Sequence, residues 1–585
     1  MSQLNKKKIS TPLNLAPFGL GVSGNGNVQV KKGPQHVLFE TLVSTLYGKD
    51  SYYESANTTV KRMKDALLQV VTQNGLKGAE YAGRVALFAR EHMYIRTMPI
   101  VMVVELAKIL QDRGLRVTQV LKKLDESIKA GTPALVDVGE MAAMYDGVQG
   151  SSPAVKMLSV EEMIGIRQSF ISNPPTYNLR GLINGVISRA DELTDLYAYA
   201  LSVFKETKKV PMSLRRGVSD AFNKFDTYQF GKYNRSEGLT LKNLLRIIHP
   251  VPVSEDNSVI FQKIMTEALE SPYTWEVELS KNGQLGAEKK SNKDLWTELV
   301  TREGSGSLGY MALLRNLRNI KEADVSNDTW KLIASKLSNP KAVAKSKQLP
   351  FGFINAYDVA KASNVPGLVL NALQEATELS LSNMPKLGER VWIIVDCSGS
   401  MNNFPGSYSY GAKKQVTENS PIKIAAIFGA ALVKASKESF QSKFTMFDDY
   451  AKHVELNPRD SIFTLYEKIM SRNAGGGTNL DSALAEKSKL GFEPDTVIIL
   501  SDMEVNRLQC GNIDKLFKGD CVKVAINLAS RNTTPLAEWK GWTQLSGWSP
   551  RIFQFVKFSR DADSIVQQLF DGGKIELSGE ADTEE

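Results

Sequence analysis

Val391-Trp392-Ile393-Ile394-Val395-Asp396-Cys397-Ser398-Gly399-Ser400 is the stretch that decides the fold of the C-terminal part of this chain. Five apolar residues are followed at once by a carboxylate and two hydroxyls. An unbroken apolar run of this length is typical of a parallel strand that is buried on both faces. Ligand sites in open α/β sheets lie outside the carboxyl ends of the strands, so this Asp-x-Ser-x-Ser motif predicts a ligand site.

Two later segments have the same character. Ala474-Gly475-Gly476-Gly477-Thr478 is a glycine-rich loop that ends in a hydroxyl, and residues 496–502 form a second apolar run that ends in a carboxylate. Together the three segments supply five oxygen donors: Asp396, Ser398, Ser400, Thr478 and Asp502. Hard oxygen donors suit magnesium, manganese or calcium rather than zinc. We therefore expect a divalent metal site, with Mg²⁺ as the favoured ion.

The motif alone has other interpretations. Ser, Gly and Asp also form ordinary turns after strands. A phosphohydrolase loop usually needs a second acid two residues after its nucleophilic Asp, and this chain has Ser398 at that position. Three such segments in this order favour the metal site. They resemble the metal-ion-dependent adhesion site of von Willebrand factor A-type domains, in which Ser398, Ser400 and Thr478 would be direct ligands. Asp396 and Asp502 would then bind the metal directly or through water.

The composition of the whole chain excludes several classes of protein. At 585 residues it should divide into several domains, and 42% hydrophobic and 23% charged residues are ordinary for a globular protein. No apolar run reaches the roughly 18–20 residues that span a bilayer, and residues 1–12 lack a signal-peptide core, so we expect a cytoplasmic protein. Three cysteines are too few for a disulfide framework, and Cys397 is expected to be a small buried hydrophobe. Four widely separated histidines argue against a zinc enzyme.

The net charge of +8 is unevenly distributed. Residues 1–390 contain 50 Lys and Arg against 39 Asp and Glu, whereas residues 391–585 contain 22 against 25. The most basic block is 201–250, with 10 against 4. A concentrated basic surface favours polyanions, chiefly nucleic acid, through counterion release. Solvated helix faces are the alternative interpretation.

Residues 35–379 are predicted to form one helix after another, because apolar residues recur at helical spacing. The expected helices are 58–74, 79–92, 98–111, 115–130, 181–205, 214–225, 241–248, 257–270, 307–320, 328–337 and 355–361. Short helices joined by brief loops favour an α solenoid of helix pairs. Residues 132–175 are rich in Gly, Pro and Ser, which indicates an insertion between helices.

After a linker at 380–389, strands and helices alternate. The expected strands are 391–396, 443–447, 496–502, 521–527 and 551–556, and the expected helices are 421–436, 460–471, 479–488 and 511–518. This alternation predicts a doubly wound parallel sheet. Residues 571–585 are predicted to be an acidic, disordered tail.

Three segments in the helical part carry a second resemblance. Residues 242–250, Lys-Asn-Leu-Leu-Arg-Ile-Ile-His-Pro, resemble the Lys-Asp-Leu-Leu-Arg segment of TROVE modules. Residues 309–318 resemble the Ala-Leu-Leu-Arg-Asn-Leu helix of these modules, and residues 349–357 resemble the segment that returns to the A-type domain. Over nearly the whole chain the resemblance is to the Ro ribonucleoprotein family, in a bacterial or phage member.

The resemblance implies an α solenoid of HEAT-like repeats closed into a ring by an α/β doubly wound von Willebrand factor A-like domain. The implied domains are a flexible segment 1–32, a TROVE ring 33–385, the A-like domain 386–570 and the tail 571–585. Family members bind small noncoding Y RNAs and the single-stranded ends of misfolded RNAs, as monomeric scaffolds and not as enzymes. Bacterial relatives can tether an exoribonuclease, polynucleotide phosphorylase.

The basic residues of the helical part agree with an RNA surface. Arg215 and Arg216 open a predicted helix, where backbone donors also favour phosphate. The later cations are interleaved with Phe225, Tyr228, Phe230 and Tyr233, whose rings could stack on unpaired bases or pack in the core. The candidate RNA-binding residues are Arg215, Arg216, Lys224, Lys232, Arg235, Lys242, Arg246, Arg315 and Arg318.

Two features limit these assignments. For Arg315 and Arg318 a structural ion pair is the alternative. Leu241 replaces a polar residue or histidine that the family often carries, so the RNA that this chain binds could differ from a Y RNA.

A metal-dependent protein-interaction module is the alternative function. Such a module would bind a carboxylate of a partner protein, while the helices serve as scaffold.

Overall fold

The computed structural model describes residues 20–22, 28–31, 33–44, 56–112, 117–137, 155–172, 178–207, 209–234, 237–270, 272–285, 288–304, 307–383, 389–402, 420–435, 441–472, 475–505, 516–517, 521–528, 533–534, 542–546, 566 and 569. The predicted strand 551–556 and tail 571–585 lie outside these residues, as do most of the predicted helix 511–518 and the candidate residue Arg235. No helix in the described part of the chain is both long and apolar enough to cross a membrane.

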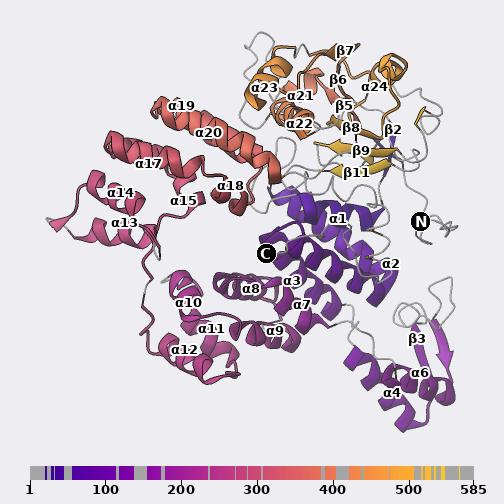
Figure 1. The fold of residues 1–585 in the computed structure, drawn as a ribbon. Coiled ribbons are helices and arrows are strands. Elements are labelled where there is room, and N and C mark those ends of the chain that lie inside the picture. The colour runs from indigo at the N-terminus through magenta and orange to yellow at the C-terminus, as the bar shows by residue number, and fades with distance from the viewer. Residues whose placement is uncertain are drawn as a thin grey trace, which may run out of the picture.

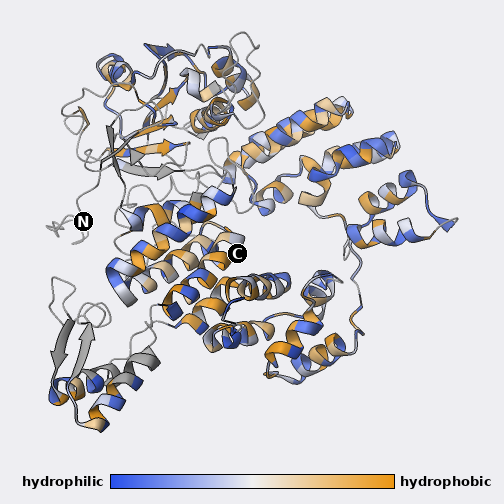
Figure 2. Ribbon diagram, turned by 180° about the vertical axis from the view of Figure 1, so that it is seen from behind, coloured by the Kyte–Doolittle hydropathy of each residue, from blue (hydrophilic) through white to orange (hydrophobic). Residues whose placement is uncertain are grey.

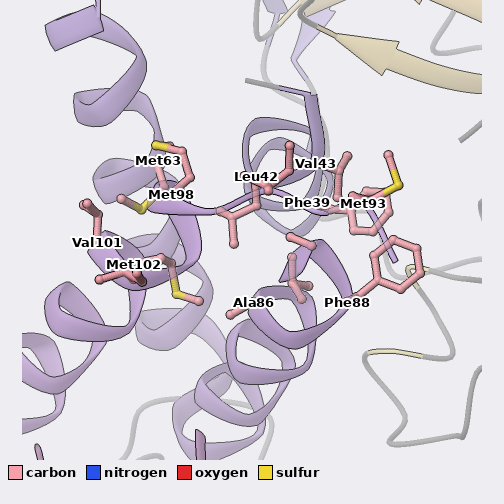
Figure 3. Close-up of a cluster of buried hydrophobic side chains, with 14 of the residues drawn as sticks. Phe39, Leu42, Val43, Met63, Ala86, Phe88, Met93, Met98, Val101 and Met102 are labelled. Carbon is pink, nitrogen blue, oxygen red and sulfur yellow. The ribbon is translucent and has the colours of Figure 1, made fainter. Parts of the chain in front are cut away.

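The first half of the helical part packs around one core. Its helices are α1 (Pro34–Ser44), α2 (Ala56–Glu91), α3 (Thr97–Asp112), α7 (Leu179–Val186), α8 (Ala190–Val203), α9 (Met212–Phe222), α10 (Thr227–Tyr233), α11 (Leu241–Ile248) and α12 (Glu255–Met265). Figure 3 shows Phe39 of α1, Phe88 of α2 and Met102 of α3 turned into the same cluster. Gly75 interrupts α2 with a left-handed φ of 53°, so the two helices that the sequence predicts on either side of it meet at a kink.

The second half of the helical part has a separate core. Its helices are α13 (Trp275–Gln284), α14 (Asn292–Thr301), α15 (Tyr310–Arg315), α16 (Leu317–Glu322), α17 (Asn327–Leu337), α18 (Pro340–Ser346), α19 (Pro350–Ala362) and α20 (Gly367–Leu379), followed by the 3₁₀ helix η3 (Ser380–Asn383). Trp296, Trp330 and Phe353 are buried in this core. Side chains of Ser291 and Ser326 accept hydrogen bonds at the N-termini of α14 and α17.

The predicted insertion 132–175 forms a small unit together with the predicted helix before it. The unit comprises α4 (Val117–Ala130), β3 (Ala134–Asp137), β4 (Val155–Leu158) and α6 (Val160–Ser172). The two strands pair in an antiparallel hairpin and α4 contacts α6. In Figure 1 this unit projects away from the other helices.

The C-terminal part is built on a six-stranded sheet. Its strands are β5 (Arg390–Asp396), β6 (Gln441–Phe447), β7 (Ala451–Val454), β8 (Thr496–Ser501), β9 (Val522–Asn527) and β11 (Trp542–Ser546), in the order β11-β9-β8-β5-β6-β7. All pairs are parallel except β6 with β7, which run antiparallel. The sheet is therefore mixed rather than wholly parallel, because the three-residue turn 448–450 is too short for a parallel crossover.

Helices cover both faces of the sheet. Along β5, Val391, Ile393 and Val395 point into the core shared with α22 (Pro421–Ala435) and α23 (Ile462–Ser471). Trp392 and Ile394 point to the opposite face, where α24 (Leu480–Ala485) packs. Figure 2 shows hydrophobic residues gathered on the central strands and on the helix faces beside them.

Both ends of the helical part touch the C-terminal part that is built on the six-stranded sheet, which we call the sheet unit. In Figure 1 the helices follow an arc that starts at α1 beside β11 and returns at α19 and α20 beside α22 and α23. At the returning end the ring centroids of Tyr357 and Phe463 lie 4.6 Å apart.

The N-terminal residues form two strands where we predicted a flexible segment. β1 (Leu20–Val22) pairs with β2 (Val28–Lys31), and β2 pairs with β10 (Thr533–Thr534) of the C-terminal part.

Two predicted helices are divided in the structure. The predicted helix 181–205 is α7 and α8, and the predicted helix 307–320 is α15 and α16. The first break occurs where the buried carboxylate of Glu192 accepts hydrogen bonds from the backbone N–H groups of Ser188 and Arg189. These two N–H groups therefore have no need of a carbonyl partner in α7, and a new helix starts there.

Gly429 of α22 provides a test of how closely this helix packs on the sheet. A Cβ at this position would lie 2.5 Å from the Phe444 ring. We expect Gly429→Ala to lower the free energy of unfolding of the sheet unit by roughly 1–3 kcal/mol, because an added methyl overpacks the core. Denaturant unfolding measures this. The control is Gly165→Ala on an exposed position of α6, which meets no atom within 4 Å and should be neutral or stabilising. Equal effects of the two changes would contradict the packing.

Candidate functional site

The predicted metal-binding residues lie where the strand order of the sheet reverses. β5 pairs with β6 on one side and with β8 on the other, so the chain proceeds outward in both directions from this point. Such a switch point leaves a crevice at the carboxyl ends of the two central strands. Asp396 ends β5, and Asp502 directly follows β8. The topology therefore places the two carboxylates beside each other.

Hydrogen bonds hold the first carboxylate in a fixed orientation. The Ser398 backbone N–H donates to Asp396 Oδ1 at 2.8 Å, and Ser501 Oγ donates to Asp396 Oδ2 at 2.6 Å. The hydroxyls of Ser398 and Ser400 lie 3.1 Å apart. Asp396 and Ser398 are completely buried. Both oxygens of Asp396 are thus engaged inside the protein.

The glycine loop brings Thr478 to the same place. Gly399 N–H donates to the Gly476 carbonyl at 2.9 Å, and Gly475 N–H donates to the Cys397 carbonyl at 3.1 Å. Gly476 has a φ of 155°, and a Cβ there would lie 2.7 Å from an Asp449 carboxylate oxygen. Only glycine accommodates both constraints. These bonds join the loop to the Asp-x-Ser-x-Ser motif, so that the buried Thr478 belongs to the same site.

The two buried carboxylates repel each other. Burial, and then the charge of Asp502, raise the pKa of Asp396 to about 7. A divalent cation would remove this conflict, and the five residues offer it carboxylate and hydroxyl oxygens, the donors that Mg²⁺ and Ca²⁺ accept. The described residues contain no cluster of three or more His, Cys, Asp or Glu side chains arranged for a metal. The candidate set differs from such a cluster because three of its five members are hydroxyls.

Two further residues, Ser501 and Asp448, shape the site and were not predicted. Ser501 donates to Asp396, as described above. Asp448, at the end of β6, is buried and accepts from Lys452 Nζ at 2.6 Å, while its carbonyl accepts from Asn479 N–H at 2.7 Å. The sequence signal was available, since Asp448-Asp449 directly follow a strand in the same way as Asp396 follows β5. Cys397 is a buried free thiol whose Sγ lies 3.2 Å from the Phe447 carbonyl, in keeping with the predicted core role.

The eight candidate RNA-binding cations within the described residues fall into three groups, and Arg235 lies outside those residues. Two have their nitrogens bound to backbone carbonyls: Arg215 Nη2 donates to Ile247 at 2.6 Å, and Lys224 Nζ donates to Asn184 and Ile187 at 2.6 and 2.7 Å. Burial, and then the Arg90 guanidinium, lower the pKa of Lys224. These two cations stabilise the packing of α9 against α11 and the end of α7.

The second group forms ion pairs at the surface. Lys242 pairs with Glu267 at 2.9 Å, and Arg318 pairs with Glu322 at 3.5 Å. The third group is exposed and forms no ion pair within the described residues: Arg216, Lys232, Arg246 and Arg315, of which Arg246, after Lys242, also helps to lower the pKa of Glu267. Exposed ion pairs contribute little to stability, so both groups can exchange their present contacts for phosphates at small cost.

Comparison with known proteins shows that a large part of the helical region matches a known domain. The model of the TROVE domain matches residues 175–270 and 265–383. An RNA-binding protein named RO60, from Deinococcus radiodurans, is 22% identical over 325 residues, which cover 50% of this chain and 59% of that protein. The TROVE match and this relative support the Ro family for the helical part. All nine candidate cations of the chain lie within the TROVE match, whereas the candidate metal residues lie outside it.

Other similarities cover less or are weaker. Telomerase protein component 1 of Rattus norvegicus and of Mus musculus are each 38% identical over 90 residues, 15% of this chain, and the chain spans 3% of their length. The crystal structure of the Deinococcus radiodurans RO (RSR) protein is 17% identical with a TM-score of 0.48, and the match covers 79% of this chain and 93% of that one.

The raised pKa of Asp396 predicts how the metal-free protein responds to pH. Its pKa is higher in the folded state than its ordinary value near 4, so the stability that protonation provides is complete at acid pH and is lost as the pH rises through about 7. We expect the metal-free protein to lose on the order of 1 kcal/mol between pH 6 and pH 8 from this group.

Denaturant unfolding in the presence of a chelator, at pH 6 and at pH 8, measures the loss. Asp396→Asn should abolish it, because an amide does not titrate. Asp449→Asn, an exposed acid on the neighbouring turn, is the matched control and should retain it. A pH dependence that survives Asp396→Asn would show that another group is responsible.

Proposed function

We propose that this chain is an RNA-binding protein of the Ro family whose TROVE helices hold RNA phosphates. The observation that carries the proposal is the group of exposed cations that form no ion pair among the described residues, Arg216, Lys232, Arg246 and Arg315. Arg216 and Arg246 lie on α9 and α11, two helices that contact each other and are joined by the bond from Arg215 to the Ile247 carbonyl. Exposed cations suit a polyanion, since each phosphate that they neutralise releases counterions.

The finer proposal concerns the kind of RNA and the role of the protein. We propose that it binds small noncoding, Y-like RNA and the single-stranded ends of structured or misfolded RNA. It would then act as a non-enzymatic scaffold in RNA quality control, with an exoribonuclease such as polynucleotide phosphorylase as a further partner. The name of the Deinococcus relative, an RNA-binding protein, supports the RNA partner.

We also propose that the helical arc is a solenoid ring closed by an A-type domain. Its two ends meet the sheet unit at different places, α1 at β11 and α19 at α22. Asp358 of α19 pairs with Lys423 of α22 at 2.8 Å, and Glu378 of α20 pairs with Lys434 of α22 at 2.9 Å. The strand order, with β5 central and β7 antiparallel at one edge, supports the A-type domain.

Neutralising two of the exposed cations tests RNA binding. We expect Arg216→Gln with Arg246→Gln to weaken binding of a hairpin RNA with a single-stranded 3′ tail and to reduce the slope of log K against log salt by about 2, since each contact contributes roughly 0.9. Fluorescence anisotropy across a KCl series measures both quantities.

The control removes two cations elsewhere, Lys487→Gln with Lys489→Gln on the sheet unit, of which Lys487 is partly buried and Lys489 exposed, and it should leave the slope unchanged. Wild-type affinity that is weak and indifferent to salt would refute the RNA-binding function. An unchanged slope in the double variant, with strong wild-type binding, would instead move the RNA to another surface.

A second candidate function is metal-dependent docking of a protein partner. The observation that favours it is the pair of buried, mutually repelling carboxylates Asp396 and Asp502 at the switch point of the sheet. We propose that Asp396, Ser398, Ser400, Thr478 and Asp502 hold Mg²⁺. An ion held by a protein in this way can keep open positions for further oxygen ligands, so a carboxylate of a partner protein could bind there.

Metal binding should be visible without any partner. We expect saturating Mg²⁺ to raise the thermal unfolding temperature of the wild type, because a ligand bound to the folded state stabilises it. Asp396→Asn should lose the increase and Asp449→Asn should keep it. RNA affinity of Asp396→Asn should equal that of the wild type. No increase in the wild type at any divalent ion concentration would refute the metal site.

A further inference from the structure

The short helix α10 is held rigidly from its inner side. Phe230 is buried, with its ring centroid 5.9 Å from that of Phe222 and 5.9 Å from that of Phe225. Gly231 packs closely against the segment around Glu270. A Cβ at position 231 would lie 2.5 Å from the Glu270 carbonyl oxygen. The aromatic residues of this region therefore divide into two sets, and Phe222, Phe225 and Phe230 belong to the core.

The other set lies nearer the surface: Tyr228 is exposed, whereas Tyr233 is partly buried against the core. Tyr228 is 51% exposed, an unusual position for a large ring on a helix whose inner side is already filled. Lys232 lies one turn further along α10, with its Nζ 5.9 Å from the centroid of Tyr228 and 5.6 Å from that of Tyr233. The guanidinium of Arg189, at the start of α8, lies 4.3 Å from the centroid of Tyr233. We call these four residues, Arg189, Tyr228, Lys232 and Tyr233, the α10 ledge.

The surroundings of the ledge are basic. Arg189 is fixed by Asp191, to which its Nε donates at 2.9 Å, and Arg96 lies 3.6 Å from Glu192. Glu192 is also engaged by the buried Arg90. Within the described residues Lys232 pairs with no carboxylate, so its charge is available to a ligand. The ledge thus presents two tyrosine rings held in place beside a free cation.

We infer that the α10 ledge binds unpaired nucleotides, with Tyr228 and Tyr233 stacking on bases and Lys232 neutralising a phosphate. Aromatic rings stack on bases of any sequence when the bases are not already paired, whereas the bases of a duplex are covered by their neighbours. The ledge would therefore give the protein a preference for single-stranded over double-stranded RNA. Of its residues, only Lys232 was among the cations predicted to bind RNA. The inference rests on the proposed RNA-binding function.

Two substitutions at Tyr228 separate the contribution of the aromatic ring to binding from that of apolar surface in general. Tyr228→Leu removes the ring but keeps an apolar side chain, and Tyr228→Phe keeps the ring. With an unstructured uridine-rich oligonucleotide as probe, we expect the Leu variant to bind about tenfold more weakly and the Phe variant to bind like the wild type. With a blunt-ended RNA duplex, which has no unpaired bases, both variants should bind like the wild type. Tyr450→Leu, at an exposed tyrosine of the sheet unit, is the matched control and should change neither affinity.

The charge of the ledge has its own readout. Lys232→Gln should reduce the salt slope for the oligonucleotide by about 0.7, the contribution of one phosphate contact to a single strand. Fluorescence anisotropy at several KCl concentrations measures this, and circular dichroism confirms that each variant is folded. The expected result is that Tyr228→Leu loses affinity only for the single-stranded oligonucleotide, and that Tyr228→Phe retains the affinity of the wild type.

Two outcomes overturn the inference while leaving the proposed function intact. In the first, the wild type binds both RNAs and Tyr228→Leu binds the oligonucleotide as well as the wild type does. In the second, Tyr228→Leu weakens binding of the oligonucleotide and of the duplex equally, which indicates a contact to the backbone rather than to unpaired bases. If the wild type binds neither RNA, the proposed function itself fails, and the inference fails with it.

Discussion

The burial of β5 on both faces is the constraint on which the rest of the sheet unit depends. Val391, Ile393 and Val395 fill one core, and Trp392 and Ile394 fill the other, so helices must cover both sides of the strand. In this sheet the strand lies between β8 and β6, with a neighbour on each edge. The chain then continues outward in both directions, and the point of reversal falls at the carboxylate that ends the strand. The location of Asp396 is a consequence of this burial.

The same burial makes the acid costly to leave as a free anion. A carboxylate that is buried beside another carboxylate favours its neutral form, and the raised pKa of Asp396 reflects this. Ser501 and the Ser398 backbone N–H orient its oxygens without supplying a positive charge. Lys452, on strand β7, binds Asp448. The site retains an electrostatic conflict that the fold itself does not resolve, which is the usual condition of a site that is completed by a ligand.

Local patterns in the sequence predicted the elements and the site better than they predicted contacts. The helix 241–248 and the strands around Ile394 and Ile498 appear where apolar periodicity placed them. The break between α7 and α8 was invisible, because it depends on Glu192 and its distant partner Arg90. The roles of Arg215 and Lys224 were hidden for the same reason, since their carbonyl partners come from other helices. Periodicity reports which face is buried, but not which atom a long cationic side chain reaches.

The helix α22 connects the two halves of the molecule mechanically. Lys423 and Lys434, eleven residues apart and thus about 16 Å along the helix, each pair with an acid of α19 or α20. Both lysine side chains are largely buried, and breaking either pair would leave a buried charge, so each contact is costly to lose. Two separated contacts fix an angle as well as a distance. Because α22 packs directly against β5, they fix the returning end of the helical arc relative to Asp396, and the basic helices and the acidic site have a defined spatial relation.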